Sequence, residues 1–219
     1  GESSYSLQLD PITGEQTKSF SYSLTTENPG QNSTLSTVRL TFHDVELDSL
    51  KIASTNVRTL KSASLGKIAE LTLSVTIPSG KSTIEISGKP QMLPFSANQS
   101  LLVNGLAPNI TSVGSYRFVS IKKGDLLDWK VKVSNTYWSV RNGSARPLIP
   151  LLLMVTLDPK YFEIMELIPN PNSTKSGGEN YWTLLVEYSA EIELRIKVAK
   201  LSEWGIATLS PFMISYSSD

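Results

Sequence analysis

The 219-residue chain contains no cysteine and a single histidine. Without cysteine, thiol catalysis, disulfide bonds and thiolate metal sites are excluded. His43 follows Phe42, the last residue of an apolar alternation, and we interpret it as a side chain at the end of a strand. A cysteine–histidine mechanism is therefore impossible, and a serine–histidine mechanism would have only His43 as its base.

Charge is also sparse, because only 18% of the residues are charged and the 20 basic residues balance the 20 acidic ones. Such a chain has no basic block for a nucleic acid or an anionic membrane. Its longest apolar run, LIPLLLMVTL at 148–157, contains Pro150 and is shorter than the ~20 residues of a membrane-spanning helix. We expect a mature chain without a membrane span, located outside the cell or on its surface, and the opening GESS suits a mature N-terminus.

The acidic residues do not form a convincing catalytic or metal site. Asp44, Glu46 and Asp48 alternate, so on an extended strand their carboxylates would share one face. Calcium takes such ligands, but the glycine and the downstream bidentate glutamate of a calcium loop are missing, which favours a solvated acidic face. Carboxylate pairs for glycoside hydrolysis are indistinguishable from solvated loop charges: Glu163 with Glu166, and Asp125 with Asp128. We predict no enzyme, no metal site and no cofactor.

Alternating apolar residues recur along most of the chain, and turns rich in Gly, Pro and Asn separate them. This period of two is typical of strands with one buried face. The stretch 59–71 comes closest to a helical pattern and is compatible with a single helical turn. Many short strands at this spacing predict an all-β protein built from antiparallel sandwiches. The alternating segments are 20–24, 38–42, 71–77, 84–86, 129–133, 181–188 and 192–198.

The stretch NGLAPNITSVGS at 104–115 separates two strand-rich halves and has the composition of a linker. We therefore predict an N-terminal arm at 1–12, a first β-sandwich domain at 13–104 and an immunoglobulin-like second domain at 105–219. Both domains have an ordinary size.

The N-terminal arm carries its own strand signal. Tyr5, Leu7 and Leu9 alternate with polar residues, and the strand stops at Asp10-Pro11. No Asn-Gly or Asp-Gly turn follows, so we expect no close hairpin partner for this strand.

Five N-x-S/T sequons, none with proline in the middle, fall in stretches that we interpret as turns or linkers. Glycans attach to exposed loops, although Asn and Ser also co-occur in turns for conformational reasons. We expect covalent N-linked glycans at Asn32, Asn98, Asn109, Asn142 and Asn172.

Two family resemblances follow from these features. About 75 residues of the second half resemble the immunoglobulin-like repeats of archaeal and bacterial surface proteins, which implies a secreted sandwich with structural duties. The chain departs from those repeats where a Gly-rich turn usually follows the asparagine, since TYWSVRNGS stands there. The matching residues are Trp129, Val131, Val133, Asn135, Pro159, Tyr161, Tyr181, Trp182, Leu184, Ile192, Leu194 and Ile196.

The whole chain is similar to the thread filament subunits of thermoacidophilic archaea, on its N-terminal strand, its five sequons, its lack of cysteine and its two-part sandwich. That resemblance implies a glycosylated pilin whose N-terminal strand, with Tyr5, Leu7 and Leu9, inserts into the neighbouring subunit. Its partners would be other copies of the same chain, and its role would be adhesion or biofilm formation. The alternative is a monomeric secreted or S-layer-associated adhesion module whose first strand completes its own sheet.

Overall fold

The protein is described by a computed structural model that covers residues 1–136, 149–157, 161–168, 174–176, 179–186, 189–198, 209 and 212–218. These residues form several antiparallel sheets and no α-helix, which confirms the prediction of an all-β protein. The strands are β1 (Glu2–Leu9), β2 (Gln16–Asn28), β3 (Thr34–His43), β4 (Lys51–Ile52), β5 (Val57–Leu65), β6 (Ile68–Ile77), β7 (Gly80–Gly88), β8 (Phe95–Val103), β9 (Ile110–Val113), β10 (Tyr116–Val119), β11 (Leu126–Asn135), β12 (Ile149–Thr156), β13 (Phe162–Ile168), β14 (Thr174–Ser176), β15 (Glu179–Val186), β16 (Ser189–Val198) and β17 (Phe212–Ser218), with the 3-10 helix η1 (Leu47–Ser49) between β3 and β4.

The chain divides into two compact units. Unit 1 comprises Gly1–Ser6, Lys18–Leu93 and Tyr216–Asp219, and unit 2 comprises Leu7–Thr17 and Pro94–Ser215. This grouping differs from the expected domains because β8 pairs with β11 and so joins unit 2. The domain bounds 13–104 and 105–219 stay predictions.

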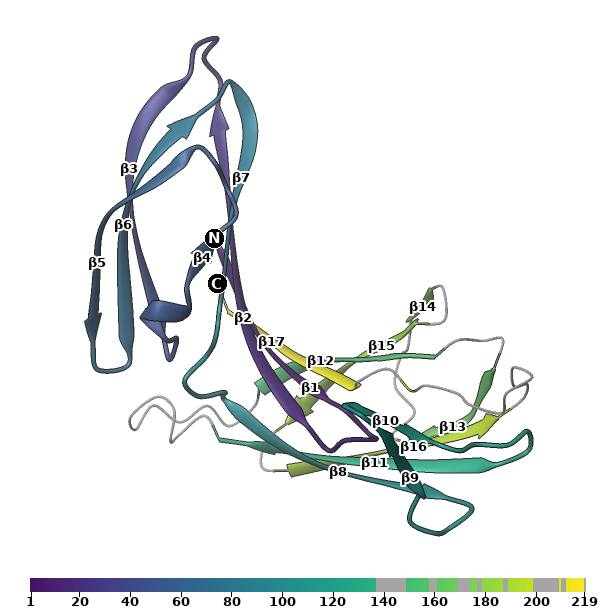
Figure 1. Cartoon of the computed structure of the whole chain (residues 1–219). Coiled ribbons are helices and arrows are strands. Elements are labelled where there is room, and N and C mark those ends of the chain that lie inside the picture. Colours follow the sequence, from purple (N-terminus) through teal and green to yellow (C-terminus); the bar gives the residue numbers. More distant parts are fainter. Residues whose placement is uncertain are drawn as a thin grey trace. The chain divides into compact units, whose positions relative to one another are not determined.

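Unit 1 is built from two antiparallel layers (Figure 1). One layer contains β1, β2, β7 and β4 in that order, and the other contains β3, β6 and β5. Alternate side chains of β6 from Ala69 to Val75 are buried, as expected for a strand with one face on a core. Phe20 of β2 and Phe42 of β3 join the layers, with ring centroids 5.2 Å apart in an edge-on arrangement.

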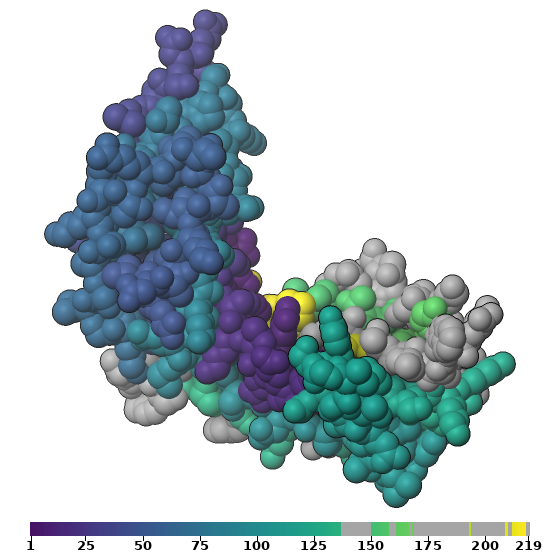
Figure 2. All heavy atoms as spheres, viewed as in Figure 1, coloured from purple at the N-terminus to yellow at the C-terminus, as the bar shows by residue number. Residues whose placement is uncertain are grey.

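Unit 2 also has two main layers. One contains β14, β15, β12, β17 and the end of β1, and the other contains β13, β16, β11 and β8. Trp129 of β11 is 1% exposed, and its ring contacts Phe212 of β17 at a centroid distance of 5.6 Å. The hairpin of β9 and β10 lies at the surface (Figure 2), where Val113 and Tyr116 are exposed.

The stretch 59–71 is not helical. It forms the hairpin of β5 and β6, which turns at Gly66 with a left-handed φ of 58°. β5 lies at the edge of its three-stranded sheet, and its register shifts between Thr59 and Lys61. A bulge and a lysine on an edge strand both hinder the addition of a foreign strand.

We expect Leu73→Ala to destabilise the protein by about 2–5 kcal/mol, because it removes a fully buried side chain from the core of unit 1. The matched control is Leu35→Ala on the neighbouring strand β3, where the side chain is 76% exposed, with a change within about 0.5 kcal/mol. Urea unfolding curves of the two variants measure the difference. Equal losses would contradict the assignment of the core to this face of β6.

Candidate functional site: the slot of strand β1

β1 lies inside the sheet of its own chain, between β17 and β2. The expectation that β1 lacks a close hairpin partner is therefore wrong, since the next strand in the sequence, β2, pairs with it. All three predicted apolar residues are buried, with exposed fractions of 3% for Tyr5, 1% for Leu7 and 0% for Leu9. We call the space that β1 fills between β17 and β2 the β1 slot.

The loop at 10–15 connects β1 to β2 without an Asn-Gly or Asp-Gly turn. The Asp10 carboxylate accepts hydrogen bonds from the backbone N–H groups of Ile12 (2.8 Å) and Thr13 (3.0 Å). The Asp10 carbonyl also accepts one from the N–H of Gly14, which has a left-handed φ of 72°. This aspartate turn closes the hairpin in the absence of the usual dipeptide signal.

The first part of β1 lies in unit 1. The Tyr5 hydroxyl donates a 2.7 Å hydrogen bond to the backbone carbonyl of His43, at the end of β3. Its ring packs against Phe20, with centroids 5.2 Å apart, and against Tyr216 at 6.4 Å. On the outer side of β1, Ser6 shares a 2.6 Å hydrogen bond with Ser19 of β2. Tyr5 is therefore held by the hydrogen bond of its hydroxyl and by an aromatic cluster.

The last part of β1 lies in unit 2, where Leu7 and Leu9 are buried and a glutamine side chain holds the end of the strand. Gln99 of β8 donates from Nε2 to the carbonyl oxygen of Asp10 at 2.6 Å. Its Oε1 accepts a 3.0 Å hydrogen bond from the indole N–H of Trp129. The orientation of the amide follows from its partners, because an indole can only donate and a carbonyl can only accept.

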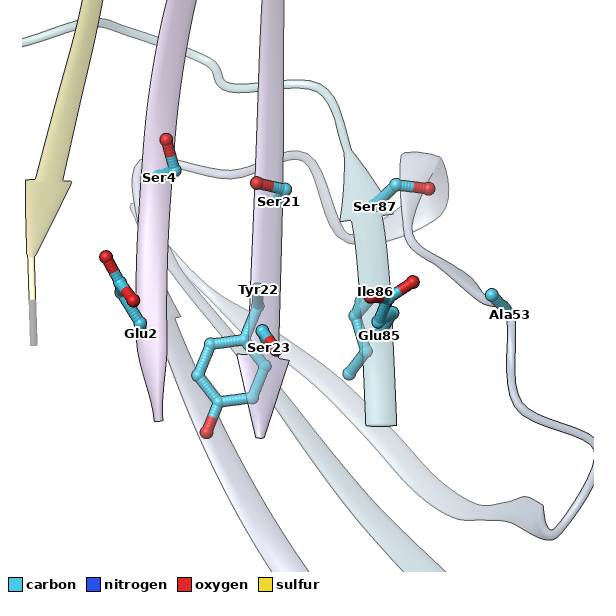
Figure 3. A pocket seen from close by; sticks show the side chains of 9 residues that line it. All are labelled: Glu2, Ser4, Ser21, Tyr22, Ser23, Ala53, Glu85, Ile86 and Ser87. Carbon is cyan, nitrogen blue, oxygen red and sulfur yellow. The ribbon is translucent and has the colours of Figure 1, made fainter. Parts of the chain in front are cut away.

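A groove of about 430 Å³ crosses the strands of unit 1. Figure 3 shows Ser4 of β1, Ser21 of β2 and Ser87 of β7 in a row, with a carboxylate on each flanking strand. Burial raises the pKa of the Tyr22 phenol above its usual value of 10.0. The hydroxyls and carboxylates offer hydrogen-bond acceptors and no cationic side chain, which disfavours anionic ligands. The lining residues are Glu2, Ser4, Ser21, Tyr22, Ser23, Ala53, Glu85, Ile86 and Ser87.

The acidic stretch after β3 is not an extended strand, so the expected carboxylate face is wrong. Asp44 is buried in a left-handed conformation, with a φ of 57°, and its backbone bonds to Lys67 and Gln91. Glu46 is the N-cap residue of η1, and Asp48 lies within that helix. Among the residues that the structure describes, no group of three His, Asp or Glu side chains could hold a metal ion.

The acidic residues that the sequence analysis considered in pairs lie in a turn or on an exposed strand surface. Asp125 accepts hydrogen bonds from the backbone of Lys122 (2.7 Å) and from the side chain of Asn104 (3.0 Å), so it stabilises a turn. Glu163 and Glu166 are exposed on β13. His43 is exposed at the end of β3, and its backbone carbonyl rather than its imidazole meets Tyr5.

Three of the five sequons fall on described residues, and all three asparagines are exposed. Asn32 lies in the loop between β2 and β3, and Asn109 directly precedes β9, within the stretch 104–115 that we expected to be a linker. Asn98 lies in the middle of β8, opposite Lys132, so its expected place in a turn is wrong. Asn142 and Asn172 lie outside the described residues.

Sequence reasoning missed Gln99, although a signal for it exists. Phe95, Ala97 and Leu101 are buried on the inner face of β8, and Gln99 occupies the same face between them. A polar residue at an inward position of an apolar alternation requires a hydrogen-bond partner. The sequence could therefore have indicated a buried polar contact, but not its partners on β1 and β11.

No protein-family model and none of the curated proteins matches the chain. None of the described segments forms a helix with the length and hydrophobicity needed to cross a bilayer. Of the residues that carry the immunoglobulin-like resemblance, Trp129, Val131 and Val133 are buried on β11. Those from Tyr181 to Ile196 lie on β15 and β16, and Pro159 lies outside the described residues.

We expect Tyr5→Phe to lower the free energy of unfolding by about 0.5–1.5 kcal/mol, because the ring keeps its packing while the bond to the His43 carbonyl is lost. Tyr116→Phe is the control, since that side chain is 75% exposed on β10. Denaturant titration of both variants and the wild type gives the comparison. A neutral Tyr5→Phe variant would show that the hydroxyl adds nothing to the seating of β1.

Proposed function

We propose that the protein is a structural subunit of an extracellular filament and that it polymerises by placing β1 in the β1 slot of a neighbouring copy. The observation that carries the proposal is the internal position of β1: it pairs on both sides, with β17 and with β2, and its three apolar side chains are buried. The loop at 10–15 connects this core strand to β2.

The β1 slot is worth enough free energy to hold two copies together. Burying three apolar side chains at about 1.5–3 kcal/mol each contributes on the order of 5–9 kcal/mol before the costs of ordering. An empty slot would also leave β17 and β2 with unpaired backbone groups, a form of edge that proteins avoid. The same contacts form whether β1 comes from the same chain or from another copy.

Strand exchange of this kind builds a filament when each copy gives β1 to one neighbour and receives β1 from another. The donated strand and the slot are different surfaces, so the contact is heterologous and propagates unless rotation closes it into a ring. Residues 10–15 would have to open to connect the two copies, and fully extended they span at most about 21 Å. The next slot must therefore begin within that distance of β2.

A self-completed adhesion module is the second candidate, and the aspartate turn favours it. Within the loop, the Asp10 carboxylate accepts from Ile12 and Thr13 and the Asp10 carbonyl accepts from Gly14, so the loop is well formed when β1 stays in its own chain. Exchange would break these bonds, whereas the contacts of β1 in the slot would be kept. The two candidates differ only in which chain supplies β1.

The absence of native cysteine allows a direct test with the variant Ser6→Cys/Ser19→Cys, because the two hydroxyl oxygens are 2.6 Å apart. In a filament this disulfide joins successive copies, so oxidised protein gives a ladder of covalent multimers on a non-reducing gel. In a self-completed module the same disulfide closes within one chain and gives a monomer band. Ser6→Cys and Ser19→Cys alone are the controls and should give no more than dimers. A monomer band at every concentration, after refolding as well, would falsify the filament.

We also propose that the sequons carry N-linked glycans, an inference supported by the exposure of the three described asparagines. Glycopeptide mass spectrometry of native material should find modified Asn32, Asn98 and Asn109. Asn56 and Asn104 are controls outside any sequon and should be unmodified. Unmodified peptides at all of the sequons would contradict this part of the proposal.

A further inference from the structure

The hairpin of β9 and β10 carries large apolar side chains that face solvent. Val113 is 60% exposed and Tyr116 is 75% exposed, and they lie opposite each other beside the turn at Gly114. Within the part of the chain that the structure describes, these two strands form a sheet of their own. A two-stranded sheet is marginally stable in water unless something packs against it. A cover on the exposed side of this hairpin would therefore stabilise it.

The register of the hairpin places a sequon on the same side as these apolar residues. Thr111 of β9 lies opposite Phe118 of β10. Side chains two residues apart on a strand share a face, so Thr111 faces the same way as Val113 and Tyr116. Thr111 completes the sequon that begins at Asn109, where the chain neither turns nor bends. Asn109 therefore continues this row as a diagonal neighbour of Phe118, at the ~7–8 Å that is usual across two strands.

We propose that the glycan on Asn109 packs over this side of the hairpin, with its first sugars on the rings of Phe118 and Tyr116. The inference rests on the proposed glycosylation and gives one of the glycans a structural role. A sugar ring presents C–H groups on its faces, and the negative face of an aromatic ring attracts their partial positive charge. The contact also removes apolar surface from water, while the sugar hydroxyls stay hydrated at the ring edge.

A glycan is better placed to cover these residues than a second protein is. It is attached covalently to the same face, so the packing is intramolecular and requires no free ligand. A glycan at Asn109 would also keep a protein surface away from Val113 and Tyr116. The face holds no charged side chain to orient a protein partner, because Arg117 lies on the other face, opposite Ser112.

The sequon at Asn98 has polar surroundings, which makes it the matched control. Asn98 lies opposite Lys132 in the middle of β8, and its neighbours on the same face of that strand are Ser96 and Ser100. Ser100 in turn lies opposite Lys130. These neighbours offer a sugar no aromatic ring, so a glycan at Asn98 would stay in solvent and leave the stability of its strand unchanged.

Hydrogen exchange measured by mass spectrometry tests this role on the glycosylated full-length chain from the native host. We expect Asn109→Gln to raise the exchange rate of the amides at 110–119 at least several-fold, because the hairpin loses its cover. Asn98→Gln should leave these amides unchanged. Thr111→Val also destroys the sequon while keeping a β-branched side chain that favours a strand, and we expect the same rise. Thr111→Ser preserves the sequon and should preserve the protection.

Tyr116→Ala shows whether the sugars contact this ring. The change should raise exchange at 110–119 several-fold more in the glycosylated chain than in the Asn109→Gln background, since only the glycosylated chain has a sugar to lose from the ring. Equal effects of Tyr116→Ala in the two backgrounds would show that the glycan does not touch the ring and would overturn the proposal.

Glycopeptide analysis of the same samples separates this proposal from the glycosylation on which it rests. An occupied Asn109, with exchange that Asn109→Gln and Thr111→Val leave unchanged, would overturn the cover and leave the glycosylation standing. An unmodified Asn109 peptide in the native protein would overturn glycosylation at this position, and the cover with it. A rise of the same size after Asn98→Gln would show a general effect of glycan loss and overturn the cover. Protection that persists without the glycan and increases with protein concentration would assign the face to a second copy instead.

Discussion

The structure depends on the pairing of β1 on both of its sides. Between β17 and β2 this strand satisfies two sets of backbone groups and buries every apolar side chain it carries. Its residues contribute to both units, since Tyr5 lies in unit 1 while Leu7 and Leu9 lie in unit 2. Removing it would leave each unit with an unfilled position in its core.

Side-chain hydrogen bonds of β1 complement its apolar contacts. Burial of Tyr5, Leu7 and Leu9 supplies most of the free energy, at about 1.5–3 kcal/mol for each side chain. The bond from the Tyr5 hydroxyl to the His43 carbonyl and the bond between Ser6 and Ser19 each add less, yet each depends on one side chain at one place. Strength and exact seating thus come from different interactions.

The sequence predicted the strands with a strict alternation and missed those without one. β6 and β11 could be located because their buried positions alternate over their whole length. β5 could not, because most of its side chains are exposed at a sheet edge and nothing imposes an apolar period on it. In β8 the inward position of Gln99 interrupts the apolar run, and the sequon at Asn98 suggested a turn.

Strand pairing and sites were harder to predict than the strands themselves. The hairpin of β1 and β2 depends on hydrogen bonds to Asp10, and its loop contains no Asn-Gly or Asp-Gly dipeptide that would have indicated it. The expected carboxylate face failed for a similar local reason, since the left-handed backbone of Asp44 ends the strand where the alternation of acids continues.

If copies exchange β1 as proposed, the division of this strand between the two units has a consequence. A copy that accepts only the first half of a neighbour's strand would gain the contacts of Tyr5. The core positions of Leu7 and Leu9 in unit 2 would stay empty, and Gln99 would lose the Asp10 carbonyl as an acceptor. A copy that accepts only the second half would leave the aromatic cluster of unit 1 incomplete. Partial insertion therefore forfeits a core contact in one unit or the other. Under the proposed function, exchange of β1 would therefore be all-or-none, and this cooperativity would favour one well-defined joint between copies over a range of partly inserted ones.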